Sequence, residues 1–158
     1  MNNTLTNAEF TASLQPEQDT VKAFIVILQK EQDALIQGEV ENLDLLASIK
    51  VKMLKQLTSF GEQRNHYLAS RGLAPDSKGM DAWLADGANS KVASIWSEAL
   101  RLAKIAQQLN QTNGAIITMR LQNYQSAFDA LQGAAGAATL YGPKGRLTGV
   151  RHQVSGIS

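Results

Sequence analysis

Proline is nearly absent from the chain, and this constrains its fold more than any other sequence feature. The 158 residues contain only three prolines, Pro16, Pro75 and Pro143. A proline inside a helix removes a backbone hydrogen bond and clashes with the preceding turn, so the long intervals between these prolines leave helices uninterrupted. Alanine, leucine and glutamine, which favour helices, dominate the composition. Because runs of β-branched and aromatic residues are nearly missing, the sequence predicts an all-α fold.

Apolar residues recur at spacings of three, four or seven over residues 16–71, as they do on one face of a helix. They are Val21, Ile25, Leu28, Leu35, Leu43, Leu46, Ile49, Met53, Leu57 and Phe60. The charged residues expected on the opposite face include Glu31, Glu41, Lys52 and Lys55. Gly38 and Gly61 fall within this pattern and each weaken a helix by about 1 kcal/mol relative to alanine. We nevertheless expect one long helix over residues 16–71.

The boundaries of this helix follow from its flanking residues. Residues 1–15 are expected to form a flexible N-terminus, and Gly72 followed by Pro75 is typical of a helix end. In the connector that follows, Asp81 is a residue type that caps helices, so we expect a short helix over residues 81–86.

The next helix is expected over residues 90–132, because Ser90 is a good N-cap residue and an apolar register continues from there in steps of three and four. The residues in this register include Val92, Trp96, Ala99, Ala106, Ile117, Leu121, Tyr124, Phe128 and Leu131. The polar stretch before Gly114 suggests a break, but the register favours a helix that passes through it. A kink at Gly114 is the alternative.

The C-terminal residues, 140–158, differ in composition from the rest of the chain. They contain four glycines and no acidic residue, and their basic residues are Lys144, Arg146 and Arg151. We expect a flexible, glycine-rich basic tail after a helical domain at 16–139. The two long helices are expected to lie antiparallel across the short connecting helix, as a helical hairpin or coiled-coil-like bundle.

Composition disfavours several functional classes. Without cysteine the chain has no thiol chemistry or zinc ribbon, and its two histidines, His66 and His152, do not suggest a metal site. Fifteen lysines and arginines balance fourteen acidic residues, which is not the charge of a general nucleic-acid binder. No segment has the length and apolarity of a membrane span, and no secretory signal is visible. We therefore expect a cytoplasmic protein without an integral membrane segment.

Candidate catalytic groups do not converge. The carboxylates Glu31, Asp33, Glu39, Glu41 and Asp44 are interspersed with lysines, which is typical of a solvated helix face. The glycine-rich run 142–149 lacks the order of a phosphate-binding loop. We expect neither enzymatic activity nor a cofactor. A paired helix presents a groove that another amphipathic helix can fill, so the sequence favours a protein-binding role. A helical coiled-coil adaptor or scaffold with an unrelated protein partner is the alternative.

Three segments make the predicted protein-binding role more specific. They are the opening helix pattern, Leu28-Gln-Lys-Glu31-Gln-Asp-Ala-Leu35 with Leu43-Asp-Leu-Leu46 and Lys50-Val-Lys-Met-Leu54; the later helix segment, Asn113-Gly-Ala-Ile-Ile117-Thr-Met-Arg120-Leu121; and the turn Leu140-Tyr141-Gly142-Pro-Lys-Gly145. In this order and spacing, the chain resembles the FlgN family of flagellar type III export chaperones over residues 23–149.

The resemblance implies a cytoplasmic, non-enzymatic chaperone for hook–filament junction (hook-associated) proteins. It would bind their C-terminal amphipathic segments, prevent premature assembly, and deliver them to the cytoplasmic domain of the export gate. Matching positions on the later helix are candidates for contact with the exported protein, with the core of the hairpin as the alternative; they are Ile116, Ile117, Leu121, Tyr124 and Phe128. Tyr141 is the candidate for docking on the export gate. The oligomeric state stays open.

Overall fold

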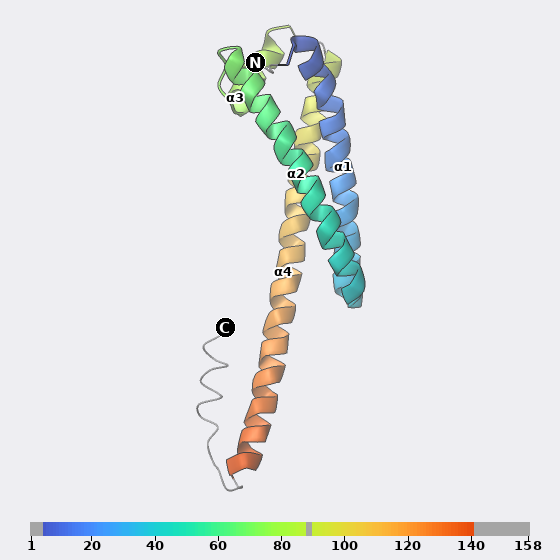
Figure 1. The fold of residues 1–158 in the computed structure, drawn as a ribbon, viewed down its shortest axis with the longest axis vertical. Helices are drawn as coiled ribbons and strands as arrows, with labels where there is room; N and C mark the ends of the chain where they lie inside the picture. Colours follow the sequence, from blue (N-terminus) through green and yellow to red (C-terminus); the bar gives the residue numbers. More distant parts are fainter. Residues whose placement is uncertain (1–4, 88–89, 141–158) are drawn as a thin grey trace. The chain divides into compact units, whose positions relative to one another are not determined.

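The computed structural model describes residues 5–87 and 90–140, with the side chains of the last helix as far as residue 133. All regular secondary structure in these ranges is helical, which confirms the all-α prediction (Figure 1). The helices are α1 (Asn7–Gln37), α2 (Val40–Ser70), α3 (Ser77–Ala85) and α4 (Ser90–Leu140). The chain divides between Asn113 and Gly114 into two compact units, each of which is considered by itself.

The prediction of a single helix over residues 16–71 is wrong, because the chain reverses direction at Gly38. This residue ends α1 with a φ of 74°, in the left-handed region that glycine enters without steric strain. Its backbone N–H and that of Glu39 both donate to the carbonyl of Ala34, which satisfies the end of the helix. The long apolar register therefore belongs to two helices joined by a tight turn.

Contacts between side chains show that α1 and α2 are antiparallel. Near the turn, Lys50 forms an ion pair with Glu31 at 3.2 Å. Far from the turn, Arg64 forms an ion pair with Glu17. Partners that are close in sequence therefore lie near Gly38, and partners that are distant in sequence lie at the other end, as in any antiparallel helical hairpin.

The flexible N-terminus expected over residues 1–15 is corrected from Asn7 onward, where α1 begins, and residues 1–4 lie outside the described residues. The Thr6 hydroxyl accepts a hydrogen bond from the Glu9 backbone N–H, and the Glu9 carboxylate accepts one from the Thr6 backbone N–H, both at 3.1 Å. This capping box satisfies two groups at the helix start. The bonds from the backbone and then the side chain of Thr6 lower the pKa of the Glu9 carboxyl. Pro16 consequently lies inside α1 rather than in its first turn.

An aromatic cluster anchors this N-terminal part of α1. The ring of Phe10 stacks on Tyr67 of α2 with centroids 4.1 Å apart, and Trp83 of α3 meets Phe10 edge-on at 4.8 Å. The side-chain oxygen of Asn7 accepts hydrogen bonds from the Tyr67 hydroxyl at 2.8 Å and the Trp83 indole N–H at 3.0 Å. The first residue of α1 thus connects three helices, and residues that the sequence left as flexible form part of the core.

The end of α2 confirms the predicted helix stop at Gly72. This glycine has a φ of 74°, and its N–H donates to the carbonyl of Ala69. The N–H of Leu73 donates to the carbonyl of Leu68 at 2.9 Å. These two bonds form a Schellman motif, in which a left-handed residue after the helix lets the chain satisfy the last carbonyls.

The connecting helix begins earlier than expected. We expected Asp81 to cap a helix over residues 81–86, but Asp76 caps α3, and its carboxylate accepts hydrogen bonds from two backbone N–H groups of the first turn. Gly79 permits the tight packing of this turn, because a Cβ there would lie 1.6 Å from the carbonyl oxygen of Ala74. The prediction therefore found the helix but placed its start too late.

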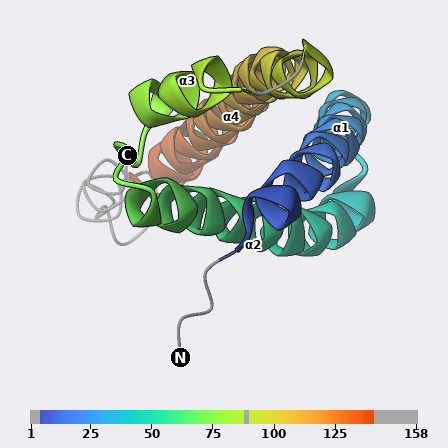
Figure 2. The same ribbon diagram turned by 90° about the horizontal axis from the view of Figure 1, so that it is seen from above.

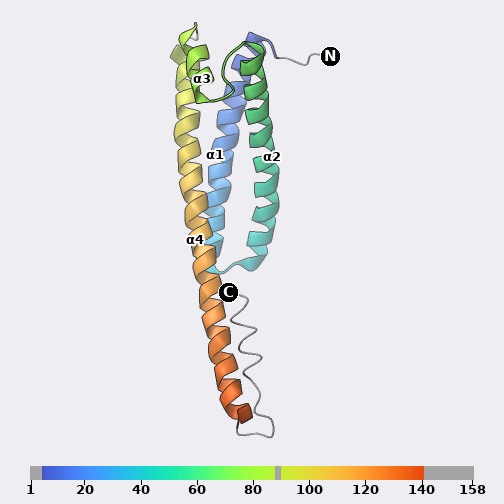
Figure 3. The same ribbon diagram turned by 90° about the vertical axis from the view of Figure 1, so that its left-hand side faces the viewer.

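In the first unit, α4 runs parallel to α1. Gln18 donates to the carbonyl of Ile95, and further along both helices Asn113 donates to the carbonyl of Leu28. The main core cluster draws buried side chains from α1, α2, α3 and the start of α4. Figures 2 and 3 show α3 at one end of the other helices of this unit. The expected pair of long helices is thus corrected to three long helices, because α1 and α2 replace the single helix predicted over residues 16–71.

The later helix starts at Ser90, as predicted, and remains helical through Gly114. It ends at Leu140 instead of residue 132, because the alanine-rich segment after residue 132 continues the helix. Leu140 belongs to the predicted tail, 140–158, and the rest of that tail lies outside the described residues.

Candidate protein-binding surface

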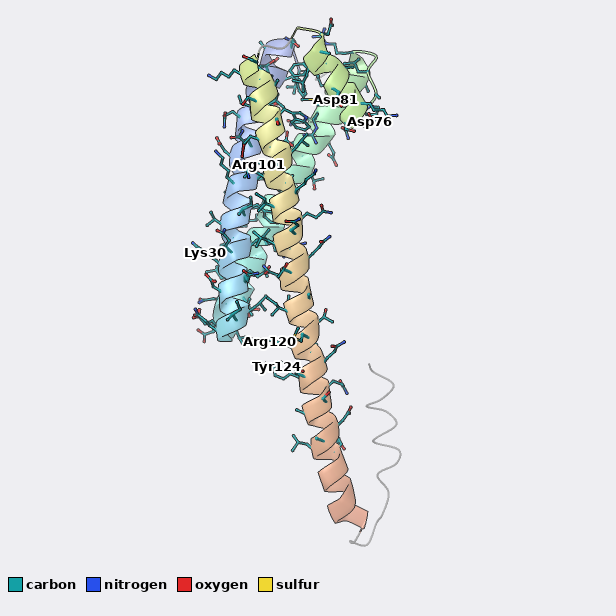
Figure 4. All side chains as sticks on the ribbon, turned by 180° about the vertical axis from the view of Figure 1, so that it is seen from behind. Lys30, Asp76, Asp81, Arg101, Arg120 and Tyr124 are labelled. Carbon is teal, nitrogen blue, oxygen red and sulfur yellow. The ribbon has the colours of Figure 1, made fainter. Side chains whose placement is uncertain are left out.

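A row of large apolar side chains follows the second unit of α4. The row consists of Ile117, Leu121, Tyr124, Phe128 and Leu131, and we call it the α4 stripe. Spacings of four, three, four and three place these side chains on one helix face. Each is between 40% and 70% exposed. Figure 4 labels Tyr124, and Arg120 one turn before it, on this part of the helix.

The α4 stripe includes four of the five residues proposed from the sequence for contact with an exported protein. Ile117, Leu121, Tyr124 and Phe128 are exposed, and none of them is in the buried core. Ile116 is half-buried and lies about 100° around the helix from its neighbour, away from the centre of the stripe. Tyr141, the candidate for gate docking, lies outside the described residues.

Leu131 was in the predicted apolar register but was not chosen as a candidate binding residue. At 70% exposure it is the most exposed member of the stripe. One further step of three residues beyond Phe128 identifies it, so the spacing alone was a sufficient signal. With Leu131 included, the stripe extends over residues 117–131, a rise of about 21 Å along the helix axis.

The surroundings of the α4 stripe contain little charge. Between residues 114 and 133 the sequence contains one basic residue, Arg120, and one acidic residue, Asp129. The hydroxyl of Thr118 donates to the carbonyl of Gly114 at 3.0 Å, so this polar group is satisfied within its own helix. Large contiguous apolar surfaces of this kind mark sites where another protein binds. The chemistry of the site is therefore burial of apolar surface.

A buried polar network lies at the last residue of the first unit. Asn113 is 1% exposed, and its side-chain N–H₂ donates to the carbonyl of Leu28 at 2.9 Å and to the Glu31 carboxylate at 2.8 Å. Glu31 also binds Lys50 of α2. The network joins α1, α2 and α4, and fixes α4 at the residue where the first unit ends.

Sequence reasoning missed this network. Glu31 was expected on a solvated face, but it is buried, because its two partners come from helices that are distant in sequence. The side-chain carbonyl of Asn113 has no hydrogen-bond partner among the described residues. The only sequence signal was the position of Asn113 in the apolar register of the later helix.

A second candidate surface, of mixed polar and apolar lining, lies beside the turn between α1 and α2. A hollow of about 440 Å³ there is lined by apolar side chains such as Ala34 and Leu46, and by the charged residues Lys30, Asp33 and Glu39. Figure 4 labels Lys30 at this end of α1. Because the lining mixes both charges with apolar groups, it does not define a ligand class.

Within residues 5–87 and 90–140, no group of His, Asp or Glu side chains is arranged to hold a metal ion. In the same part of the chain, no helix combines the length and apolarity needed to cross a membrane.

An all-helical fold with an exposed apolar helix face is typical of the class of helical proteins that bind other proteins through such a face. Comparison with protein families makes the class specific: the FlgN protein family matches residues 1–149, so the chain belongs to the FlgN family. This bears out the resemblance found in the sequence. No significant match was found among curated proteins or among solved structures. The family consists of flagellar export chaperones rather than enzymes, and flagellar export chaperone is the general role of this chain.

Proposed function

We propose that the α4 stripe binds the C-terminal amphipathic segment of a hook–filament junction protein. In this role the chain acts in the cytoplasm, keeps the exported subunit from assembling early and delivers it to the export gate. The observation that carries the proposal is that five large apolar side chains at helical spacing are exposed on α4. The chain belongs to a family of export chaperones, for which such a surface is a suitable binding site.

The geometry of the α4 stripe suits an amphipathic helix as its ligand. Side chains at alternating spacings of three and four present a seam into which the apolar face of a second helix fits. Full burial of one leucine or phenylalanine side chain contributes about 1.5–3 kcal/mol. The five side chains are about half exposed in the free protein, so covering them gives a substantial but not extreme driving force.

The energetics of this binding allow the exported segment to be released as well as bound. An exported segment that folds on binding loses conformational entropy, which subtracts from the affinity gained by apolar burial. Because the stripe is flanked by few charges, the affinity depends mainly on apolar contact and changes little with salt. Such a complex protects the aggregation-prone face of the subunit and still dissociates at the gate.

Tyr141 is proposed to dock on the cytoplasmic domain of the export gate, a role separate from subunit binding. The proposal rests on its place in the family resemblance, at the start of the Tyr-Gly-Pro-Lys-Gly segment that follows α4.

The test is calorimetric titration of the full chain with a peptide that spans the C-terminal helix of a hook–filament junction protein. We expect one-to-one binding with a negative heat-capacity change, the signature of apolar burial. Phe128→Asp should abolish binding because it places a charge in the stripe. Ser126→Asp is the matched control: it adds the same charge to the opposite helix face and should bind normally. Tyr141→Ala should also bind normally if Tyr141 serves the gate.

An adaptor or scaffold with an unrelated partner is the alternative function. It predicts no heat with the junction-protein peptide and no complex in gel filtration. That result would reject the proposed exported protein and leave the α4 stripe as a surface for a different partner. Binding that survives Phe128→Asp and is lost in Ser126→Asp would place the subunit on the face of α4 opposite the stripe, and would contradict the proposal.

A further inference from the structure

In the first unit, α2 and α4 leave an opening between them, with α1 behind it (Figure 3). A groove of about 310 Å³ lies there, and we call it the α2–α4 groove. Most of its lining side chains are apolar, and they come from all three helices. They are Val21 and Phe24 of α1, Leu54 and Leu57 of α2, and Ala103 and Ala106 of α4, with Glu17, Gln107 and Asn110 as the polar members.

Polar contacts that join the three helices lie at both ends of the groove. At one end, Arg64 of α2 pairs with Glu17 of α1 and lies over the ring of Trp96 of α4, 4.8 Å from its centroid. At the other end lies the buried network of Glu31 described above. Glu17 and Glu31 are separated on α1 by a rise of about 21 Å, so the interval between the two ends accommodates about four turns of a helix.

Exposed apolar side chains extend the groove over both of its walls. Leu54 is 45% exposed, and with Val51 it also lines a second hollow, of about 340 Å³, on α2. Leu100 of α4 is exposed to the same extent and precedes Ala103 by three residues, so the two share one side of the helix. The apolar face of one further helix would cover both walls at once, as in a four-helix bundle.

The charges on the two walls have one sign. Residues 45–61 of α2 contain three lysines and no acidic residue, and residues 99–113 of α4 contain one lysine, one arginine and no acidic residue. Lys55 and Lys104 are exposed beside the apolar lining, and neither has an ion-pair partner among the described residues. The acidic groups of α1 at the two ends of the groove are already in the ion pairs described above. The unpaired charge beside the groove is therefore positive.

We propose that the α2–α4 groove binds an acidic amphipathic helix of another protein, which completes a four-helix bundle with α1, α2 and α4. The apolar face of this helix covers the floor of the groove and the exposed leucines, and carboxylates along its edges pair with Lys55 and Lys104. The groove belongs to the first unit and the α4 stripe to the second, so the proposal does not rest on the proposed function. The two surfaces also differ in their charge requirement, because the stripe is flanked by few charges.

Two synthetic helices that differ only in charge test the proposal. Each has about three heptads with leucine at the core positions, and the flanking positions are glutamate in one peptide and lysine in the other. Fluorescence anisotropy measures their binding to the full chain with Phe128→Asp, which places a charge in the α4 stripe and prevents capture of leucines there. We expect the glutamate peptide to bind roughly tenfold more tightly at low salt, and this ratio to fall as salt screens the exposed pairs. Equal affinities, or no binding of either peptide, would overturn the proposal.

Charge reversal on α2 locates the bound helix. Lys55→Glu should weaken binding of the glutamate peptide by roughly fivefold, because it replaces an attraction with a repulsion. Lys52→Glu is the matched control: it makes the same change in net charge, and helical spacing places it on the opposite side of α2 from Leu54. Equal effects of the two reversals would place the peptide elsewhere and overturn the proposal.

Removal of one apolar side chain tests the other half of the contact. Leu54→Gln should weaken binding of the glutamate peptide, whereas Val26→Gln, at a residue of α1 with similar exposure, should leave it unchanged. Circular dichroism checks that both variants are folded, and if Leu54→Gln is not, the reversal at Lys55 still decides the proposal. Equal peptide affinities in the two folded variants would contradict it.

Two other occupants of the groove are distinguished by further measurements. Sedimentation of the chain alone would reveal a dimer that dissociates in Leu54→Gln, which would assign the groove to a second copy. Binding to vesicles that contain phosphatidylserine, together with no binding of the glutamate peptide, would assign it to an anionic lipid surface. Either result would overturn the proposal of an acidic helix.

Discussion

Helix α4 contains two stretches with the same kind of apolar spacing and different surroundings. In residues 90–113, side chains such as Trp96 and Leu102 are buried against other helices of the first unit. In residues 114–133, the corresponding side chains of the α4 stripe are exposed. The pattern of apolar residues therefore determines that both stretches form an amphipathic helix, but it does not determine where the partner of that face comes from.

The residue types on the two faces follow this difference. The buried face of the first stretch contains the small side chains Ala99 and Ala106, which let neighbouring helices approach closely. The second stretch carries leucine, tyrosine and phenylalanine at equivalent spacings. Large side chains on an exposed helix face supply the contact area that a protein ligand requires. The comparison shows that the first stretch contributes to the folded core, and it supports the proposal that the second binds another protein.

The largest expected effect compares one substitution at two leucines of α4. Leu102 is 8% exposed and Leu121 is 62% exposed. Leu102→Ala should lower the free energy of unfolding by about 2–5 kcal/mol, because it leaves a cavity in the core. Leu121→Ala should change it by no more than about 0.5 kcal/mol, as surface substitutions do. Urea denaturation of both variants measures the difference, and equal losses would contradict the division of α4 into a folding and a binding stretch.

A smaller effect is expected for two asparagines of α4. Asn113→Ala removes the hydrogen bonds to Leu28 and Glu31, and should lower the free energy of unfolding by about 1–3 kcal/mol. Asn123 is exposed, so Asn123→Ala should be neutral or slightly stabilising through helix propensity alone. Thermal unfolding of the two variants isolates the contribution of the buried network. A neutral Asn113→Ala would show that the network does not hold α4 in the first unit.

The smallest effect concerns two glycines in the apolar register of residues 16–71. Gly38→Ala should lower the free energy of unfolding by about 1–2 kcal/mol, because alanine is strained at a φ of 74°. Gly61→Ala should raise it by up to about 1 kcal/mol, since a Cβ there meets Arg64 at an ordinary 3.6 Å inside α2. Denaturation midpoints compare the two. A stabilising Gly38→Ala would contradict the turn that separates α1 from α2.

These two glycines also show where prediction from sequence reached its limit. Both lie in one continuous apolar pattern, and nothing local separates the glycine that ends a helix from the one inside it. The choice depends on packing between distant residues, such as the stack of Phe10 on Tyr67, which forms only when α2 folds back. The all-α character of the chain and the end of α2 at Gly72 were predictable, because both follow from the local preferences of the residues involved.

Some missed features had a local signal and others had none. The Thr6–Glu9 spacing is that of a capping box, and Asp76 follows a proline, so both helix starts were readable from neighbouring residues. The bond between Glu31 and Asn113 joins positions that only the fold brings together. The stripe residues were found from spacing and family resemblance, but their exposure follows from the absence of a covering helix in the described part of the second unit.

Hydrogen exchange of α4, with and without a junction-protein peptide, tests the central claim most directly. In the free protein we expect backbone amides of residues 92–113 to exchange slowly and those of 115–131 to exchange fast, because local opening is easiest where few apolar contacts are buried. Saturating peptide should protect residues 115–131 and leave 92–113 unchanged. Protection that appears only on α1 and α2, or equally slow exchange of both stretches in the free protein, would contradict the account.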